Sequence, residues 1–179
     1  MKRHAFLAVA LSLVCVLTGC SAGVASARDA ADEQATTTMA NPWTSAESGE
    51  EAGKGAFDDV FAVPEDLALG DIEWKAPKFS YMEGIAEANY DGGAVEAWVR
   101  KGSGVSGSDL HGVYNEFEVS WTTDVDGVQV SCSGHEEGVA NLLEWNVGNY
   151  GYTAYVIGLG GENYGVDAAD ISGLVSSIK

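Results

Sequence analysis

Three short turn sequences constrain the fold of this 179-residue chain most strongly. They are Asp91-Gly92-Gly93, Asp126-Gly127 and Val147-Gly148-Asn149-Tyr150. Each lies between two runs typical of strands: 79–90 and 94–101, 113–122 and 128–133, and 139–146 and 151–159. Glycine beside aspartate or asparagine supplies the positive φ angles that tight hairpin turns need. The sequence therefore predicts three antiparallel hairpins.

Alternation within these runs indicates a sheet with one covered face. Val128, Val130 and Cys132 share one side of their strand, and polar residues occupy the other. A second set, Val113, Asn115, Phe117, Val119 and Trp121, alternates in the same way with Glu116 and Glu118 opposite. Such a pattern is typical of an antiparallel sheet that packs on a core through one face only.

Two helices are expected at the ends of the domain. Thr44-Ser45-Ala46-Glu47 resembles a capping box and predicts a short helix ending near Ala56, which its glycines weaken. At the other end, four apolar residues recur at helical spacing: Ile171, Leu174, Val175 and Ile178. Asp167 or a neighbour is expected to cap this second helix.

Between the first helix and the hairpins, Val60–Val63 and Ile72–Trp74 also have strand character. We therefore expect an α+β fold: an antiparallel meander sheet of about six strands, with an N-terminal and a C-terminal helix packed on one face.

The N-terminus has the layout of a secretory signal. Met1-Lys2-Arg3-His4 is basic, Ala5–Leu17 is apolar, and Leu17-Thr18-Gly19-Cys20 follows. The last four residues resemble the lipobox of bacterial lipoproteins. That resemblance implies cleavage between Gly19 and Cys20, with a diacylglyceryl lipid on the Cys20 thiol. It also implies an extracytoplasmic protein whose first partner is the lipid bilayer.

The chain divides into three parts. Residues 1–19 are expected to be the signal peptide, and residues 20–40, which have no aromatic residue, a disordered lipidated tether. Residues 41–179 are long enough for one globular domain. Loss of Cys15 with the signal and lipidation of Cys20 would leave only Cys132, so no intrachain disulfide is expected.

The charge balance excludes a nucleic-acid partner. Without Lys2 and Arg3 the chain has seven basic and 27 acidic residues, a formal charge of −20. Such a field repels phosphate backbones and favours solubility, and it would attract cations.

The domain also resembles an uncharacterised sheet domain of Gram-positive surface lipoproteins. The residues that carry the likeness are Asn41-Pro42-Trp43, Glu144-Trp145, Tyr152-Thr153-Ala154-Tyr155 and the closing Leu174-Val175-Ser176-Ser177-Ile178. The likeness implies a sheet domain at the cell surface and no activity, so it transfers no catalytic residue.

Catalytic and metal sites find little support in the sequence. His111 and His135 are the histidines that follow the signal, and neither stands in a nucleophile motif. Cys132 lies on the apolar side of its strand and is expected in the core. Asp124 and Asp126 suggest a calcium loop, but Thr122 and Ser133 stand where that loop needs acidic ligands, so a hairpin turn explains them better. We expect no cofactor and no metal.

Aromatic residues form the remaining candidate site. Trp98 alternates with Glu96 and Arg100, which predicts that it lies on the wet side of the sheet, while Tyr150, Tyr152 and Tyr155 crowd one hairpin. Exposed rings could stack on sugars or anchor a protein. The alternative is that they pack under the helices or across strands.

Together these features favour a membrane-anchored, non-catalytic binding or interaction module at the cell surface, with an envelope protein or a small ligand as partner. The first alternative is a tethered structural or accessory envelope domain without its own ligand. A hydrolase is a distant second alternative.

Overall fold

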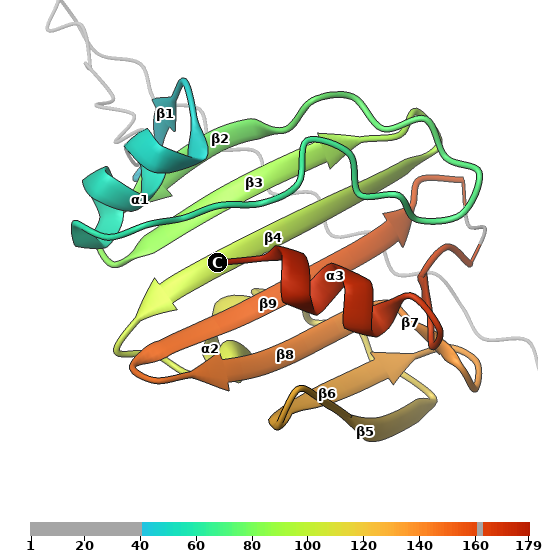
Figure 1. Cartoon of the computed structure of the whole chain (residues 1–179). Coiled ribbons are helices and arrows are strands. Elements are labelled where there is room, and N and C mark those ends of the chain that lie inside the picture. The colour runs from blue at the N-terminus through green and yellow to red at the C-terminus, as the bar shows by residue number, and fades with distance from the viewer. Residues whose placement is uncertain (1–40, 161–162) are drawn as a thin grey trace, which may run out of the picture. The chain divides into compact units, whose positions relative to one another are not determined.

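One antiparallel sheet forms the centre of the fold (Figure 1). The structure is a computed structural model that describes residues 41–160 and 163–179. Within these ranges the main sheet has eight strands, in the order β1-β2-β3-β4-β9-β8-β6-β5. They are β1 (Thr44–Ala46), β2 (Lys78–Met82), β3 (Ile85–Asp91), β4 (Val95–Ser103), β5 (Val119–Val125), β6 (Val128–Gly134), β8 (Leu142–Val147) and β9 (Tyr150–Gly158).

The remaining elements are short. Strands β7 (Val139–Ala140) and β10 (Val166–Asp167) form a separate two-stranded pair. The described residues include three helices: α1 (Gly49–Phe57), α2 (Gly107–Leu110) and α3 (Ile171–Ser177). The expected α+β class with an antiparallel sheet is therefore confirmed.

The expected strand number is wrong, because the described part of the main sheet has eight strands rather than about six. Residues 79–90 hold two strands, since the chain reverses at Gly84, which has a φ of 77°. The sheet is also more than a meander. Strands β1–β4 form one block and β5, β6, β8 and β9 another, and the pairing of β4 with β9 joins them.

Two expected strands before β2 are absent from the described structure: Val60–Val63 and Ile72–Trp74 lie in an irregular connection. This connection covers the core with the buried side chains of Phe61, Leu67, Leu69 and Trp74. Within it Ala62 exchanges two backbone hydrogen bonds with Lys179 (3.0 and 2.9 Å), and the Lys75 amide donates one to the Asp91 carbonyl (3.0 Å). Burial of single large side chains, rather than strand pairing, therefore organises the segment.

The predicted capping box lies four residues too early. Thr44–Ala46 instead forms the edge strand β1, paired with β2, and α1 begins after Ser48. The Ser48 hydroxyl accepts a hydrogen bond from the Glu51 amide (3.2 Å), and the Glu51 carboxylate accepts one from the Glu47 amide (2.8 Å). The serine–glutamate spacing of a capping box thus occurs at Ser48 and Glu51.

The C-terminal helix is confirmed, and its four apolar residues are all buried. Asp170, rather than Asp167, stands at the N-cap, and its side chain makes no capping hydrogen bond. All three predicted hairpin turns are present, with φ angles of 52° and 85° at Asp126 and Gly127.

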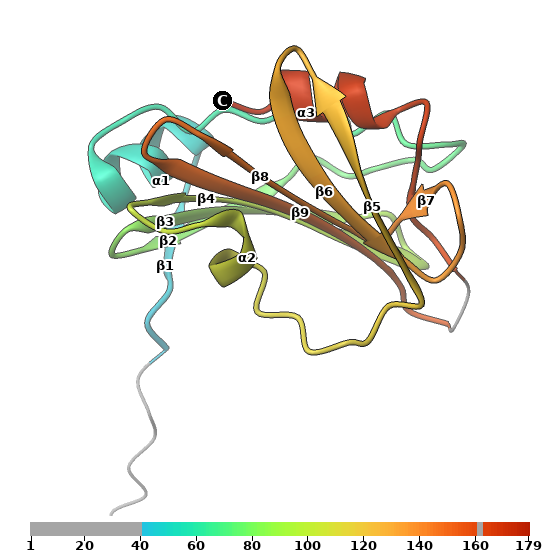
Figure 2. The same ribbon diagram turned by 90° about the horizontal axis from the view of Figure 1, so that it is seen from below.

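The helices divide the two faces of the sheet (Figure 2). Helices α1 and α3 lie on one face, here called the covered face, together with the irregular connection before β2. Helix α2 and the connection that follows it lie on the opposite face, here called the second face. Along β4, Val95, Ala97 and Val99 are buried on the covered face, so the residues between them point to the second face.

None of the helices in the described ranges combines the length and apolar character that a membrane crossing requires.

Candidate functional site

The four candidate aromatic residues do not share one surface. In the register of β4 with β9, Trp98 stands opposite Tyr155, and Lys101 stands opposite Tyr152. Trp98 and Tyr155 therefore point to the second face, whereas Tyr152 points to the covered face with Tyr150, two residues away. Gly19 and Cys20, the predicted cleavage and lipidation positions, lie outside the described residues.

Tyr150 and Tyr152 belong to a cluster around a buried lysine. Tyr152 is stacked on Trp145, with 5.4 Å between ring centroids. The Lys101 ammonium lies 4.1 Å from the centre of the Tyr150 ring and 5.7 Å from that of Tyr152, and it donates a hydrogen bond to the Val60 carbonyl (2.5 Å). The lysine itself thus fills the space between these rings.

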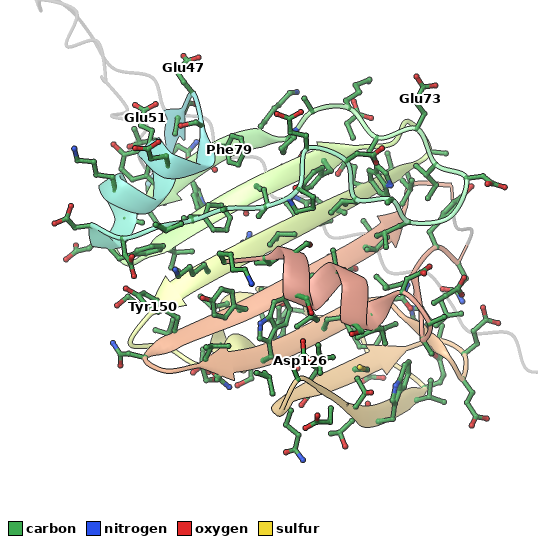
Figure 3. The ribbon with its side chains drawn as sticks, in the orientation of Figure 1. Glu47, Glu51, Glu73, Phe79, Asp126 and Tyr150 are labelled. Carbon is green, nitrogen blue, oxygen red and sulfur yellow. The ribbon has the colours of Figure 1, made fainter. Side chains whose placement is uncertain are left out.

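The outer rim of this cluster is polar. Tyr150, at the start of β9 (Figure 3), donates a hydrogen bond from its hydroxyl to Asp59 (2.7 Å). This bond, with one from the Val60 amide and the nearby charge of Lys101, holds the pKa of Asp59 below its usual value. The contacts give Tyr150 a packing role.

Trp98 and Tyr155 form a stacked pair on the second face. Their ring centroids are 5.5 Å apart and the planes differ by 16°. Trp98 is half-buried, and Tyr155 is buried beside it. The Tyr155 hydroxyl accepts a hydrogen bond from the side-chain Nδ2 of Asn115 (2.9 Å), and burial raises the pKa of this phenol.

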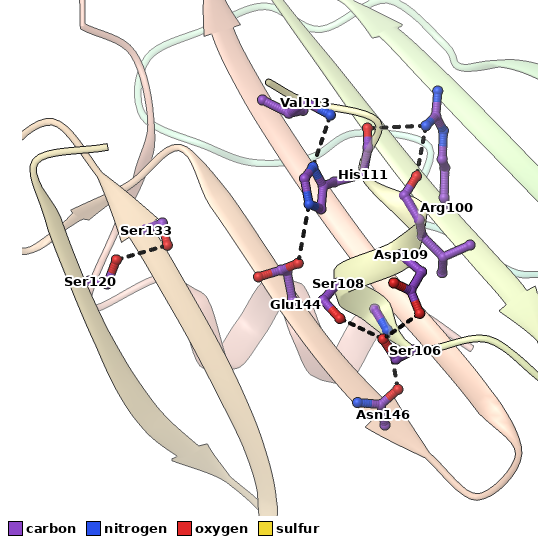
Figure 4. A network of polar contacts seen from close by, with 12 residues as sticks. Arg100, Ser106, Ser108, Asp109, His111, Val113, Ser120, Ser133, Glu144 and Asn146 are labelled. Carbon is purple, nitrogen blue, oxygen red and sulfur yellow. Dashed lines mark hydrogen bonds and ion pairs between the residues drawn. The ribbon is translucent and has the colours of Figure 1, made fainter. Parts of the chain in front are cut away.

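Residues 111–118, here called the strap, cross the second face between α2 and β5 (Figure 2). Residues 113–118 were expected to be part of a strand, and the structure contradicts this. Arg100 holds the start of the strap: its Nη1 donates to the carbonyls of Leu110 (2.8 Å) and His111 (3.1 Å), as Figure 4 shows. Its Nε donates to Glu87 (2.7 Å), so the guanidinium is also paired with a carboxylate.

His111 fixes the strap to β8 (Figure 4). Its Nδ1 accepts a hydrogen bond from the Val113 amide (2.8 Å), so a neutral ring carries its proton on Nε2. That nitrogen lies 3.7 Å from the Glu144 carboxylate. Burial raises the pKa of Glu144; the His111 charge acts against this and Asp109 adds to it.

The other end of the strap is held by an exposed pair, the Glu118 carboxylate and the His135 ring. The hydrogen bond from His135 lowers the pKa of Glu118. The Phe117 ring packs 5.3 Å from the same imidazole. The strap is thus attached at its start, at Asn115 and at its end.

A pocket of about 160 Å³ lies between the strap and the sheet. Its walls are Trp98, Arg100, His111, Gly112, Val113, Thr153 and Tyr155. A larger hollow of about 370 Å³ shares Tyr155 and extends along Asn115, Phe117 and Asn141. Tyr155 therefore borders both spaces, and Trp98 borders the smaller one.

One pocket residue, Thr153, has an unsatisfied polar group. It stands opposite Arg100 on β4 and opposite Glu144 on β8, and it is 2% exposed. Its hydroxyl has no hydrogen-bond partner among the described residues. A buried hydroxyl without a partner is destabilising, and it is therefore uncommon in folded proteins.

Sequence reasoning did not identify Thr153, Glu144 or the strap as parts of a site. Alternation along β9 could have placed Thr153 on the same face as Tyr155, but the partner strand that completes the pocket is far away in sequence. The role of His111 depends on the path of the strap, which has no local sequence signal.

The residues considered for other chemistry lie elsewhere. Cys132 is 1% exposed on the covered face, and burial raises its pKa to about 11. Asp124 accepts a hydrogen bond from the Gly127 amide (3.0 Å) within the β5–β6 hairpin. In the ranges that the structure describes, no group of three or more histidine, cysteine or acidic residues is arranged to hold a metal ion.

The site is thus a small, partly aromatic pocket between a strap and the second face, with a buried hydroxyl in its wall. Comparison of the chain with protein-family models, with curated proteins and with solved structures found no match.

Proposed function

We propose that this protein is a lipid-anchored, extracytoplasmic binding module that holds its ligand on the second face of the sheet. The observation that carries the binding part is the pocket bordered by the stacked Trp98–Tyr155 pair. Trp98 is outside the hydrophobic core cluster, so its large ring contributes to a surface instead. Partly exposed aromatic rings beside a hollow are typical of ligand sites.

The anchoring part rests on the sequence. The basic start, the apolar run and Leu17-Thr18-Gly19-Cys20 support export and lipidation at Cys20. Attachment by two or more acyl chains would hold the domain stably at a membrane surface.

We also propose that the module is non-catalytic. His111 is the side chain in the pocket best suited to act as a base. Its Nδ1 accepts from the Val113 amide and its Nε2 faces Glu144, while the Thr153 hydroxyl is unpaired. Since neither ring nitrogen contacts that hydroxyl, the arrangement does not activate it as a nucleophile.

Lipidation can be tested by growing cells with an alkyne-labelled fatty acid. We expect label and membrane association for the full chain, and loss of both for Cys20→Ala. Cys132→Ala is the matched control and should keep both. Equal labelling of the two variants would refute the anchor.

Binding can be tested with the full chain in detergent micelles and the envelope fraction of its own cells. We expect Trp98→Ala to weaken binding at least tenfold with an unchanged circular dichroism spectrum. Leu159→Ala is the control, because Leu159 is 58% exposed and lies outside both the strap and the pocket. A folded wild-type protein that binds nothing would instead support the tethered structural domain.

A further inference from the structure

The Thr153 hydroxyl points to a ligand with its own hydroxyl groups. This side chain lines the pocket, is 2% exposed and has no described hydrogen-bond partner. A hydroxyl can both donate and accept, and a ligand hydroxyl can do the same in return. Binding would therefore satisfy a group that the protein leaves unpaired.

The charged groups around the pocket make most of their contacts within the protein. Arg100 is the cationic wall residue, and its Nε and Nη1 are already bonded to Glu87 and to two carbonyls. The overall charge of −18 also repels anions. No carboxylate is among the described wall residues, and the neighbouring Glu87 and Glu144 carboxylates already face Arg100 and His111. A neutral ligand is favoured.

The shape and size of the pocket narrow the class of ligand further. Trp98 and Tyr155 provide stacked aromatic surface, on which the apolar C–H face of a sugar ring packs well. The pocket volume of about 160 Å³ is well below the roughly 300 Å³ at which pockets for drug-sized ligands begin. It therefore suits a single ring, with the adjoining hollow beyond Tyr155 available to further units.

From these observations we infer that the pocket binds one ring of a neutral sugar, with the Thr153 hydroxyl paired to a sugar hydroxyl and Trp98–Tyr155 against the ring. This inference rests on the proposed binding function and specifies its ligand class.

The test uses the full chain in a sugar-free detergent and saturation-transfer NMR titrations. The neutral probes are glucose, galactose, mannose and N-acetylglucosamine, and the charged analogues are glucosamine and glucuronate. We expect at least one neutral sugar to bind at least tenfold more tightly than both charged analogues. Equal or tighter binding of a charged analogue, or no binding of any neutral sugar, overturns the inference.

Variants at Thr153 separate a binding role from a structural one. Thr153→Val should weaken sugar binding at least fivefold and raise the melting temperature, because it replaces an unpaired buried hydroxyl with a methyl group of similar size. Thr153→Ser keeps the hydroxyl and should keep binding. Thr122→Val, on the exposed part of β5, is the control and should leave the affinity unchanged. Unchanged affinity in Thr153→Val would refute the pairing.

The sugar titrations and the envelope-binding assay together distinguish failure of the sugar ligand from failure of the binding module. If Trp98→Ala reduces envelope binding while no sugar binds the wild-type protein, the binding module stands and the sugar ligand is refuted. If the envelope fraction does not bind either, both fail.

Discussion

Two glycines in helices should respond to alanine in opposite directions, because their surroundings differ. Helix α1 lies so close to the connection after it that a Cβ atom at Gly53 would be 2.4 Å from the Asp59 carbonyl oxygen and 2.7 Å from the Phe61 amide nitrogen. At Gly173 in α3, a Cβ atom would meet nothing within 4 Å among the described residues.

The expected magnitudes follow from helix propensity and from packing. Alanine in place of glycine inside a helix stabilises by about 0.5–1 kcal/mol, which we expect for Gly173→Ala. At Gly53 this gain is opposed by overpacking, which costs about 1–3 kcal/mol. Since the contacts are with backbone atoms that cannot rotate away, we expect Gly53→Ala to be destabilising by about 1–2 kcal/mol.

Urea denaturation of the two variants and the wild-type protein measures the difference. The midpoint should rise for Gly173→Ala and fall for Gly53→Ala, with an unchanged m-value in both. Equal stabilisation by the two substitutions would refute the close approach of α1 to residues 59–61.

Two further predictions concern buried titratable groups. Tyr90 is fully buried and donates a hydrogen bond to the Pro64 carbonyl (2.6 Å), so Tyr90→Phe should lower the free energy of unfolding by about 1 kcal/mol at pH 7. Burial raises the pKa of Tyr90, and the unfolded state loses this proton first, near pH 10. The free energy of unfolding of the wild-type protein should therefore fall as pH rises above about 10. In Tyr90→Phe this fall should be smaller by about 1.4 kcal/mol per pH unit. Urea titrations at alkaline pH that give the same pH dependence for both proteins would contradict this. The Cys132 side chain is buried and its pKa is raised to about 11, so iodoacetamide at pH 8 should alkylate it only in urea. Mass spectrometry of the peptide that contains Cys132 measures the reaction. Rapid alkylation of the native protein would contradict the burial of this thiol.

The sequence could predict features that depend on neighbouring residues. Asp126-Gly127 carries its own turn geometry, and the alternation of Trp98 with Val99 assigns the two to opposite faces wherever the strand pairs. The apolar spacing in α3 likewise identifies its buried side without knowledge of the sheet.

Features that depend on distant residues could not be predicted in the same way. The alternating residues of the strap resemble a strand, yet Arg100 and Tyr155 hold them across the second face instead. The pocket exists only because Thr153 and Trp98 come together in the pairing of β9 with β4, across about fifty residues of chain. No local pattern encodes that pairing, so the unpaired Thr153 hydroxyl could be recognised only from the structure.

The pairing of β4 with β9 has a consequence for when the protein can fold. The two strands meet over nine residue pairs, from Val95 opposite Gly158 to Ser103 opposite Tyr150. A chain that emerges N-terminus first, from a ribosome or a secretion channel, cannot form this contact until β9 has followed. Until then β4 has an open edge and α3 is missing from the core. The complete sheet should therefore not form, and the chain should stay able to pass through a narrow channel, until β9 and α3 have appeared.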